Sequence, residues 1–180
     1  MAALEQAGAF LEGHFQLASG RHTDRYLEKF RLLERPPQTE LVCRKMAEAM
    51  RPTRPATVAG PTTGGVILAY ELARQLGVRA IIAERDEGGG RSFQRGFRLQ
   101  PGERVVVVDD VLTTGRSLRD TIGAVAKAGG ETVGVAVMVD RTAGTVDFGV
   151  PFFAATDVEM DSFDPARCAL CRDGVALTIT

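Results

Sequence analysis

The sequence has few cysteines, no excess of charge of either sign and no long hydrophobic run. Only three cysteines occur among 180 residues, so the fold cannot depend on a disulfide framework. The 22 basic and 23 acidic side chains give a formal net charge of -1, which argues against a protein that binds nucleic acid. No apolar run approaches the roughly 18 residues that span a membrane. Residues 1–15 have no basic stretch ahead of an apolar one, so we expect a cytoplasmic protein that binds neither nucleic acid nor membrane.

The composition is that of an ordinary globular protein. Hydrophobic residues make up 44% of the chain and charged residues 25%, so the chain can bury a core and is not disordered. One domain typically has roughly 150 residues, so we expect a single domain with room for a small appendage. No internal repeat is present in the sequence.

Glycine and proline divide the middle of the chain into alternating helical and extended blocks. This alternation predicts an α/β fold with a parallel sheet and right-handed crossovers, in which ligands bind beyond the carboxyl ends of the strands. Helices are expected over residues 39–50, 66–77 and 118–130, and strands over residues 56–59, 78–84, 105–110 and 132–140. Unusual chemistry stands at three of the strand ends, at residues 60–65, 109–117 and 140–144.

The most informative strand end follows the run VVVVDD. Four β-branched residues predict a buried strand, and the carboxylates of Asp109 and Asp110 come directly after it. Burying two uncompensated charges side by side is costly, so they must face something polar. Sugar hydroxyls with a divalent cation nearby would satisfy them, and so would solvent around an ordinary loop. The next residues, Thr113 to Ser117, predict an anion pocket of N–H and hydroxyl groups at a helix N-terminus.

The strand, the acid pair and the Thr-Thr-Gly loop together resemble the phosphoribosyl diphosphate (PRPP) signature of type I phosphoribosyltransferases. Competing phosphate motifs are absent from the sequence, which has neither a GxxxxGK[ST] P-loop nor a GxGxxG turn after a first strand. The resemblance implies the type I phosphoribosyltransferase fold, a mostly parallel sheet flanked by helices, with a small hood. We expect one domain, with its core over about residues 38–160 and its hood over about residues 1–37 and 161–180.

Two further segments fit the same family. GPTTGG at residues 60–65 is similar to its diphosphate-binding loop, where small residues let the backbone approach the leaving group. Without the acid pair and the Thr-Thr-Gly loop elsewhere in the chain, this segment would be interpreted equally well as an ordinary β-to-α turn. Residues 85–97 resemble the flexible loop that closes over bound diphosphate, and a solvated hairpin is the alternative. The implied diphosphate loop comprises Thr62, Thr63, Gly64 and Gly65.

The ends of the chain resemble the orotate phosphoribosyltransferases. FQLASGRHTDRYLEKF, at residues 15–30, is similar to their SGR segment, and the stretch from residue 150 onward is similar to their C-terminal part. DRTAG matches the segment in which an arginine binds the carboxylate of orotate, a role that falls on Arg141; otherwise Arg141 is a surface cation. The resemblance implies PRPP contacts by Arg85, Asp109, Asp110, Val111, Leu112, Thr113, Thr114, Gly115, Arg116 and Ser117, and orotate contacts by Ser19, Gly20, Arg21, Thr113 and Arg141.

The implied activity is transfer of the 5-phosphoribosyl group of PRPP to orotate, giving orotidine 5′-monophosphate and diphosphate in UMP biosynthesis. Asp109 and Asp110 would be the catalytic pair. Mg²⁺ would be held by the diphosphate of PRPP and not directly by the protein. A homodimer with shared active sites is also implied. Two alternatives stay open: the same fold acting on a purine or uracil, and a non-catalytic regulator that senses PRPP.

The sequence departs from the family pattern in two places. Ala18 stands where many members carry a lysine before the SGR stretch. The flexible loop has arginines where members carry lysine and histidine, so Arg91 or Arg95 is expected to substitute. Because of the glycines at residues 88–90, this loop can be matched to the family pattern in two ways that differ by one residue. The choice between the two arginines therefore stays open.

The cysteine pair near the C-terminus has half of a zinc-site spacing. Cys168 and Cys171 form a CxxC motif, but no second CxxC or nearby histidine completes four ligands in the sequence. We therefore assign no metal to this pair. Of the two histidines, His22 is expected to line the site beside Arg21.

Overall fold

The computed structural model describes residues 2–17 and 19–180, so Ala18 lies outside the described residues. A six-stranded sheet forms the centre of the molecule, and its strands are parallel except for β5, which pairs antiparallel with β4. This confirms the predicted α/β fold with a mostly parallel sheet. The strand order is β5 (Arg91–Phe93), β4 (Arg79–Arg85), β3 (Thr57–Pro61), β6 (Arg104–Leu112), β7 (Glu131–Asp140) and β8 (Phe152–Asp157).

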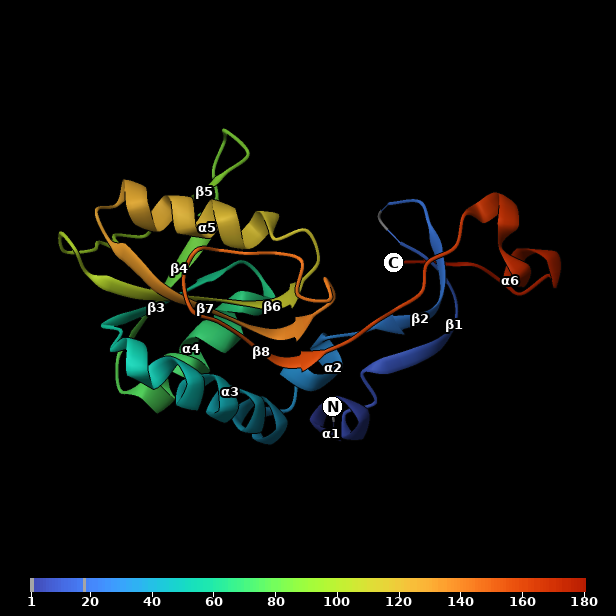
Figure 1. Cartoon of the computed structure of the whole chain (residues 1–180), viewed down its shortest axis with the longest axis horizontal. Helices are drawn as coiled ribbons and strands as arrows, with labels where there is room; N and C mark the ends of the chain where they lie inside the picture. The colour runs from blue at the N-terminus through green and yellow to red at the C-terminus, as the bar shows by residue number, and fades with distance from the viewer. Residues whose placement is uncertain (1, 18) are drawn as a thin grey trace.

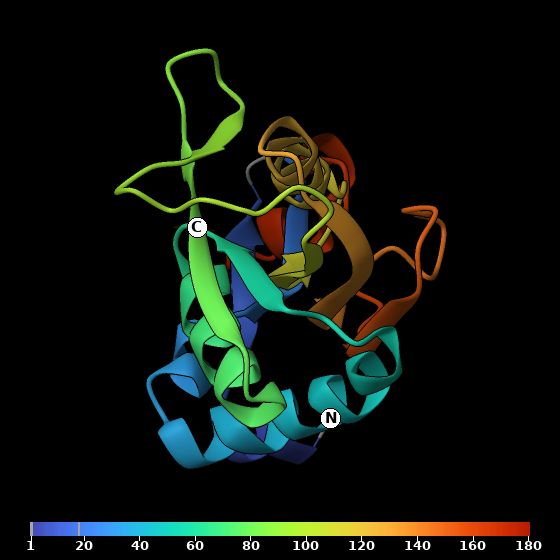
Figure 2. The same ribbon diagram turned by 90° about the vertical axis from the view of Figure 1, so that its left-hand side faces the viewer.

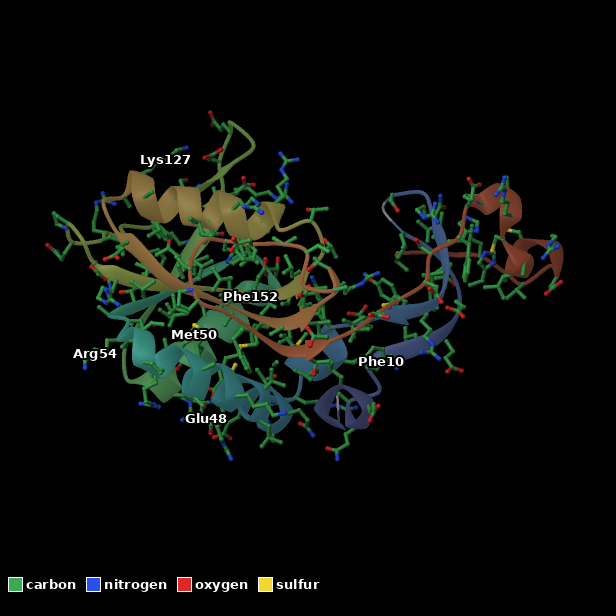
Figure 3. All side chains as sticks on the ribbon, in the orientation of Figure 1. Phe10, Glu48, Met50, Arg54, Lys127 and Phe152 are labelled. Atoms are coloured by element: carbon green, nitrogen blue, oxygen red, sulfur yellow. The ribbon has the colours of Figure 1, made fainter. Side chains whose placement is uncertain are left out.

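Helices cover both faces of this sheet. Helices α3 (Pro36–Met50) and α4 (Gly64–Leu76) lie on one face, and α5 (Arg116–Lys127) lies on the other (Figure 1). Glu48 on α3 and Lys127 on α5 point away from the sheet on opposite sides (Figure 3). The short 3-10 helix η1 (Arg51–Thr53) follows α3 directly. None of the described helices is long and apolar enough to cross a membrane.

The valine run of β6 is buried on both faces of the sheet. Val106 and Val108 belong to the apolar cluster that includes α3 and α4, whereas Val105 and Val107 belong to the cluster beneath α5. Successive side chains of a strand point to opposite faces, so a strand covered on both sides is apolar throughout. This is why an unbroken apolar run, rather than an alternating one, stands before the acid pair.

A second, small sheet lies beside the main one, and the sequence did not predict it. Its strand order is β2 (His22–Leu27), β1 (Phe10–Gln16) and β9 (Thr178–Ile179), with the short helices η2 (Pro165–Arg167) and α6 (Ala169–Arg172) alongside. We call residues 10–27 and 161–180 the small lobe. It extends from the core at the end where the N-terminal and C-terminal parts of the chain meet (Figure 1).

The small lobe is narrower than the expected hood. Helices α1 (Ala2–Gln6) and α2 (Phe30–Leu33) pack into the main core through Leu4, Leu32 and Leu33. Both helices lie within residues 1–37 and contribute to the main core. Phe10, at the start of β1, packs against the same core where the lobe joins it (Figure 3).

The carboxyl ends of the parallel strands point toward the small lobe (Figure 1). The turn between β4 and β5 projects away from the body of the molecule (Figure 2). The strand ends, this hairpin and the lobe together frame the region where ligands bind in open parallel sheets.

Candidate active site

Asp109 and Asp110 stand together near the end of β6, and both are buried. The carboxylate of Asp109 accepts a hydrogen bond from the Asp110 N–H at 2.9 Å. Asp110 Oδ2 lies 2.8 Å from Lys29 Nζ, an ion pair in which the lysine side chain is 34% exposed. Asp110 thus has an ion-pair partner at the start of α2, whereas Asp109 forms no ion pair within the described residues.

Burial, and after it the neighbouring charge of Asp110, raises the pKa of Asp109 to about 6. Hydrogen bonds from the Asp110 amide and from Ser117 act in the opposite direction, as does the charge of Lys29. Two carboxylates held this close in a buried site favour a cationic or hydrogen-bond-donating ligand, because either one stabilises the ionised pair.

Replacing Asp109 with asparagine should favour the folded state more at pH 8 than at pH 5. The folded-state pKa of about 6 lies above the usual 3.8, so the neutral carboxyl contributes stability at low pH that is lost as the pH rises through 6. Asparagine does not titrate, so the stability of Asp109→Asn relative to the native chain should rise by about 1–2 kcal/mol between the two pH values. Urea unfolding at both pH values measures it. The exposed Asp24 offers a matched Asp→Asn control, and a difference that does not change with pH would contradict the raised pKa.

The loop from Thr113 to Ser117 connects the acid pair to helix α5. Gly115 has φ +76°, a left-handed conformation that glycine adopts without strain, and α5 begins at the next residue. A helix N-terminus favours a bound anion. The loop borders a cavity of about 240 Å³, which is also lined by Arg85, Arg91, Asp109 and Asp120. Cations, hydroxyls and a helix N-terminus around one cavity suit a phosphorylated ligand.

The turn at residues 60–65, which runs from the end of β3 to the start of α4, lies directly against the acid pair. A Cβ atom added at Gly64 would stand 1.9 Å from Asp110 Oδ2, and one added at Gly65 would stand 3.2 Å from Asp109 Oδ1. The Thr62 N–H donates to the Ala83 carbonyl at 3.2 Å, which fixes the turn to β4. Glycine is therefore required here by close approach to the carboxylates, which an ordinary β-to-α turn would not explain.

We expect Gly64→Ala to damage the site, because the added methyl group displaces the Asp110 carboxylate from Lys29. The destabilisation should be about 1–3 kcal/mol, as for other overpacked positions, with a fall in catalytic efficiency, kcat/KM, of about tenfold or more. Gly123→Ala on α5 is the matched control, since nothing lies within 4 Å of its added Cβ. Thermal unfolding and steady-state kinetics of both variants check this. Equal behaviour of the two variants would contradict the proposed close approach.

The three arginines of residues 85–97 have different surroundings. Arg91, on β5, is buried and donates to Ala83 O at 2.9 Å, Thr62 O at 3.2 Å and Ser117 Oγ at 3.1 Å. Arg85 lines the 240 Å³ cavity with it. Arg95 is exposed and paired with Glu84 at 2.9 Å. The segment is a β4–β5 hairpin, and only its first two arginines face the cavity.

A second cavity, of about 580 Å³, adjoins the first, and both are lined by Val111, Thr113 and Thr114. Arg141 lies in it half-buried, and burial lowers the pKa of its guanidinium. No carboxylate pairs with Arg141 in the part of the chain that the structure describes. Tyr26, Lys29 and Asp110 also line this cavity. A half-buried cation without an acid partner, beside the acid pair, suits an anionic second ligand.

The turn after β7 positions Arg141. Asp140 is buried and accepts hydrogen bonds from the Thr142 N–H and hydroxyl, both at 2.7 Å. The Arg141 N–H donates to Leu112 O at 2.9 Å, which ties this turn to the end of β6. The DRTAG segment is thus locked next to the acid pair, as its proposed role requires.

The SGR segment lies only partly in the site. Ser19 lines the 580 Å³ cavity, but Arg21 is exposed and donates to the hydroxyl of Ser162 at 2.8 Å. The expectation that His22 lines the site beside Arg21 is wrong, because its ring is buried against His14.

Sequence reasoning assigned no role to Lys29, which the structure pairs with Asp110. Lys29 lies in the RYLEKF part of the N-terminal segment that resembles the family, and this position was the only indication in the sequence that it could belong to the site. A single lysine in an amphipathic stretch does not reveal its partner 81 residues away, because only the fold brings α2 to the end of β6.

Comparison with known proteins points to one family. The phosphoribosyl transferase domain family matches residues 32–153. An orotate phosphoribosyltransferase from Heliobacterium modesticaldum is 49% identical over 92% of this chain and 87% of its own, and one from Pelotomaculum thermopropionicum is 45% identical over 97% and 92%. A crystal structure of the Mycobacterium tuberculosis orotate phosphoribosyltransferase with PRPP superposes with a TM-score of 0.71 at 26% identity, covering 87% of this chain and 94% of the other.

Proposed function

The chain belongs to the phosphoribosyltransferase family and, within it, to the orotate phosphoribosyltransferases, and we propose that its two adjoining cavities bind PRPP and orotate. The reaction transfers the 5-phosphoribosyl group of PRPP to orotate and releases diphosphate. The observation that supports the placement of orotate is Arg141, a half-buried cation without a carboxylate partner among the described residues. Its cavity shares Thr113 and Thr114, from the Thr113–Ser117 loop, with the first cavity.

PRPP is placed in the 240 Å³ cavity, which Asp109 lines, next to Asp110, which lines the adjoining cavity. Its 5′-phosphate accepts hydrogen bonds from the Thr113–Ser117 loop at the start of α5. The ribose hydroxyls donate to Asp109 and Asp110, which are acceptors when ionised. The diphosphate then extends toward the turn at residues 62–65 and toward Arg91, which is bonded to that turn.

Orotate fits the 580 Å³ cavity with its carboxylate on Arg141. A guanidinium binds a planar carboxylate through two parallel hydrogen bonds, and a half-buried setting strengthens this pairing. Thr113 and Thr114 line both cavities, so the base and the sugar meet above them. Ser19, from the small lobe, also lines this cavity.

The chemistry is a displacement at C1′ of the ribose. Orotate N1 forms a bond to C1′ while the bond from C1′ to the diphosphate oxygen breaks, and positive charge develops on the sugar as in other glycosyl transfers. The paired carboxylates of Asp109 and Asp110 stabilise that charge. Mg²⁺, held by the diphosphate oxygens of PRPP, would supply charge neutralisation of the leaving group. The buried carboxylates of Asp109 and Asp110 fit such a hard cation, because they would provide oxygen-rich, negative surroundings nearby.

We assign the cationic role of the flexible loop to Arg91 and not to Arg95. Arg91 lines the PRPP cavity and donates to Ser117 and to the turn at Thr62. Arg95 lies outside that cavity and is held by Glu84. Arg91 is therefore the arginine positioned to meet the diphosphate when the β4–β5 hairpin closes over the substrate.

We also propose a homodimer that works in the cytoplasm. Helices α3 and α4 expose three large apolar side chains, Leu41, Ile67 and Tyr70, with Tyr70 70% exposed. Because α4 begins at the diphosphate loop, a second copy seated on these helices would lie next to the active site, as a shared site requires. Sedimentation equilibrium measures the state, and a monomer at micromolar concentration would contradict the proposal.

The deciding experiment follows orotate absorbance with PRPP and Mg²⁺. We expect consumption of orotate and formation of orotidine 5′-monophosphate, with parallel reactions containing uracil, adenine, hypoxanthine or xanthine far slower. Faster turnover of another base would assign the chain to that acceptor. Binding of PRPP without consumption of any base would instead support a regulator that senses PRPP.

A further inference from the structure

Four metal-ligating side chains meet in the small lobe, three of them buried and the fourth exposed. His14 comes from β1, His22 from β2, and Cys168 and Cys171 flank the start of α6. One ligand atom of each lies within 4.8 Å of all the others. The expectation that no histidine stands near the CxxC pair is therefore wrong, because 154 residues of sequence separate His14 from Cys168 and the fold closes that gap.

The distances match a tetrahedral centre. His14 Nε2 lies 2.9 Å from His22 Nδ1, 3.5 Å from Cys168 Sγ and 3.7 Å from Cys171 Sγ, and His22 Nδ1 lies 3.3 Å from Cys171 Sγ. Zinc with bond lengths near 2.0–2.1 Å to nitrogen and 2.3 Å to sulfur requires about 3.4 Å between two nitrogens and about 3.6 Å between nitrogen and sulfur. These four separations lie within about 0.5 Å of the required values, and the other pairs of ligand atoms lie within 4.8 Å of each other. Side-chain rotation can bring all four atoms to the metal.

The ring of His14 is already oriented as a ligand. Its Nδ1 lies 2.8 Å from the carbonyl oxygen of Val175. A carbonyl only accepts hydrogen bonds, so the proton of the neutral ring is on Nδ1 and the lone pair of Nε2 points at the other three side chains. A backbone carbonyl that holds the second nitrogen is the usual support of a metal-bound histidine.

The lobe has almost no other interior. Among its described residues, the buried hydrophobic side chains are Phe15, Leu27 and Cys168, and Leu27 belongs to the main core. The buried polar residues are His14, His22 and Thr23. Segments too small to build an apolar core are commonly held by disulfides or metals. Most of what this lobe buries is thus the ligand set itself.

We propose that His14, His22, Cys168 and Cys171 bind one structural Zn²⁺ that joins the C-terminal segment to the β1–β2 hairpin. The two thiols lose their protons to solvent on binding, so two thiolates balance the charge of the cation, and both histidines bind as neutral rings. Four protein ligands close the coordination sphere, so this centre has no open position for substrate and does no chemistry.

Zinc at this point acts on the orotate cavity through the lobe. Leu17, Ser19 and Thr180 line that cavity and belong to the lobe. Ser19 lies between the ligands His14 and His22 in the sequence. Thr180 directly follows β9, and its N–H donates to the carbonyl oxygen of Gln16 on β1. The metal therefore holds one wall of the cavity in place without touching the reacting atoms.

The first test is the zinc content of untagged protein, measured by inductively coupled plasma mass spectrometry. We expect about one zinc per chain in the native protein and a loss of at least nine-tenths of it in Cys171→Ser. Cys171 is exposed, so this substitution spares the packing of the lobe. Cys43→Ala is the matched control, because Cys43 is buried in α3, where burial raises the pKa of its thiol to about 12, and it should keep its zinc.

The second test titrates the metal-free native protein with Co²⁺ and with Zn²⁺. Tetrahedral cobalt with thiolate ligands should produce visible absorption bands that Zn²⁺ abolishes, and Cys171→Ser should show neither. Hydrogen exchange should report protection by zinc confined to residues 10–27 and 161–180, with the main sheet unchanged. The thermal midpoint should rise by several degrees on adding zinc.

Two results would overturn the proposal. One is native protein that carries no more zinc than Cys171→Ser and binds Zn²⁺ no more tightly. The other is a Cys168–Cys171 disulfide, found by mass spectrometry of protein purified without reductant and persisting after incubation with zinc and reductant. Because both readouts are independent of orotate turnover, neither depends on the catalytic assignment.

Discussion

Replacing Arg141 with alanine is expected to lower kcat/KM for orotate by about 30-fold to several thousand-fold, the equivalent of about 2–5 kcal/mol. The loss is large because the orotate carboxylate would enter a partly desolvated cavity without its cation. Arg141 has no acid partner among the described residues and lines the orotate cavity and not the PRPP cavity. KM for PRPP should therefore stay nearly unchanged.

Selectivity distinguishes this role from a structural one. Uracil has no carboxylate and gains nothing from Arg141, so the variant should discriminate less between orotate and uracil. Arg141→Lys keeps the charge but loses the forked geometry, and we expect an intermediate loss. Arg44→Ala, an exposed arginine on α3 paired only loosely with Glu40 at 3.9 Å, is the control. Wild-type orotate efficiency and selectivity in Arg141→Ala would make Arg141 an ordinary surface cation.

The part of the site that the sequence predicted lies on elements with strong local signals. The valine run of β6 and the acids after it form one uninterrupted pattern, and the helix that follows is preceded by a glycine in the left-handed conformation. Parallel strands bring their carboxyl ends to one edge, so finding the strands was enough to bring Asp110, the turn at residues 60–65 and Arg141 together.

The part that the sequence did not predict lies on elements whose order comes from distant contacts. The strands of the small lobe read FLEGHFQ and HTDRYL, with histidines and charges where an apolar alternation would have revealed a sheet. Strand β9 has only two residues. The cluster of four metal-ligating side chains brings His14 to Cys171, and the Lys29–Asp110 ion pair connects the start of α2 to β6. Both contacts join residues that are far apart in the sequence, so neither produces a recognisable short-range sequence pattern.

Replacing Asp110 with asparagine should lower kcat by about 100-fold or more and leave the fold intact, the scale for loss of one charge contact in a transition state. Asp110 lies where the two cavities adjoin. It lines the orotate cavity itself, and its neighbour Asp109 lines the PRPP cavity. Asparagine preserves the shape of the side chain, so the loss reports charge. Orotate kinetics at saturating PRPP measure it, with the exposed Asp24→Asn as the control.

The role of Lys29 can be separated from that of Asp110 by a double-mutant cycle. If Lys29 acts only by orienting the Asp110 carboxylate through its 2.8 Å ion pair, then Lys29→Met should reduce kcat in the native chain but add little further loss to Asp110→Asn. If Lys29 contacts a substrate itself, the two losses should multiply, because each change would remove a separate interaction. The cation lines the orotate cavity, so a change in KM for orotate in Lys29→Met would show the direct contact. Near-native kcat in a folded Asp110→Asn would contradict the catalytic role of the acid pair, whatever Lys29 does.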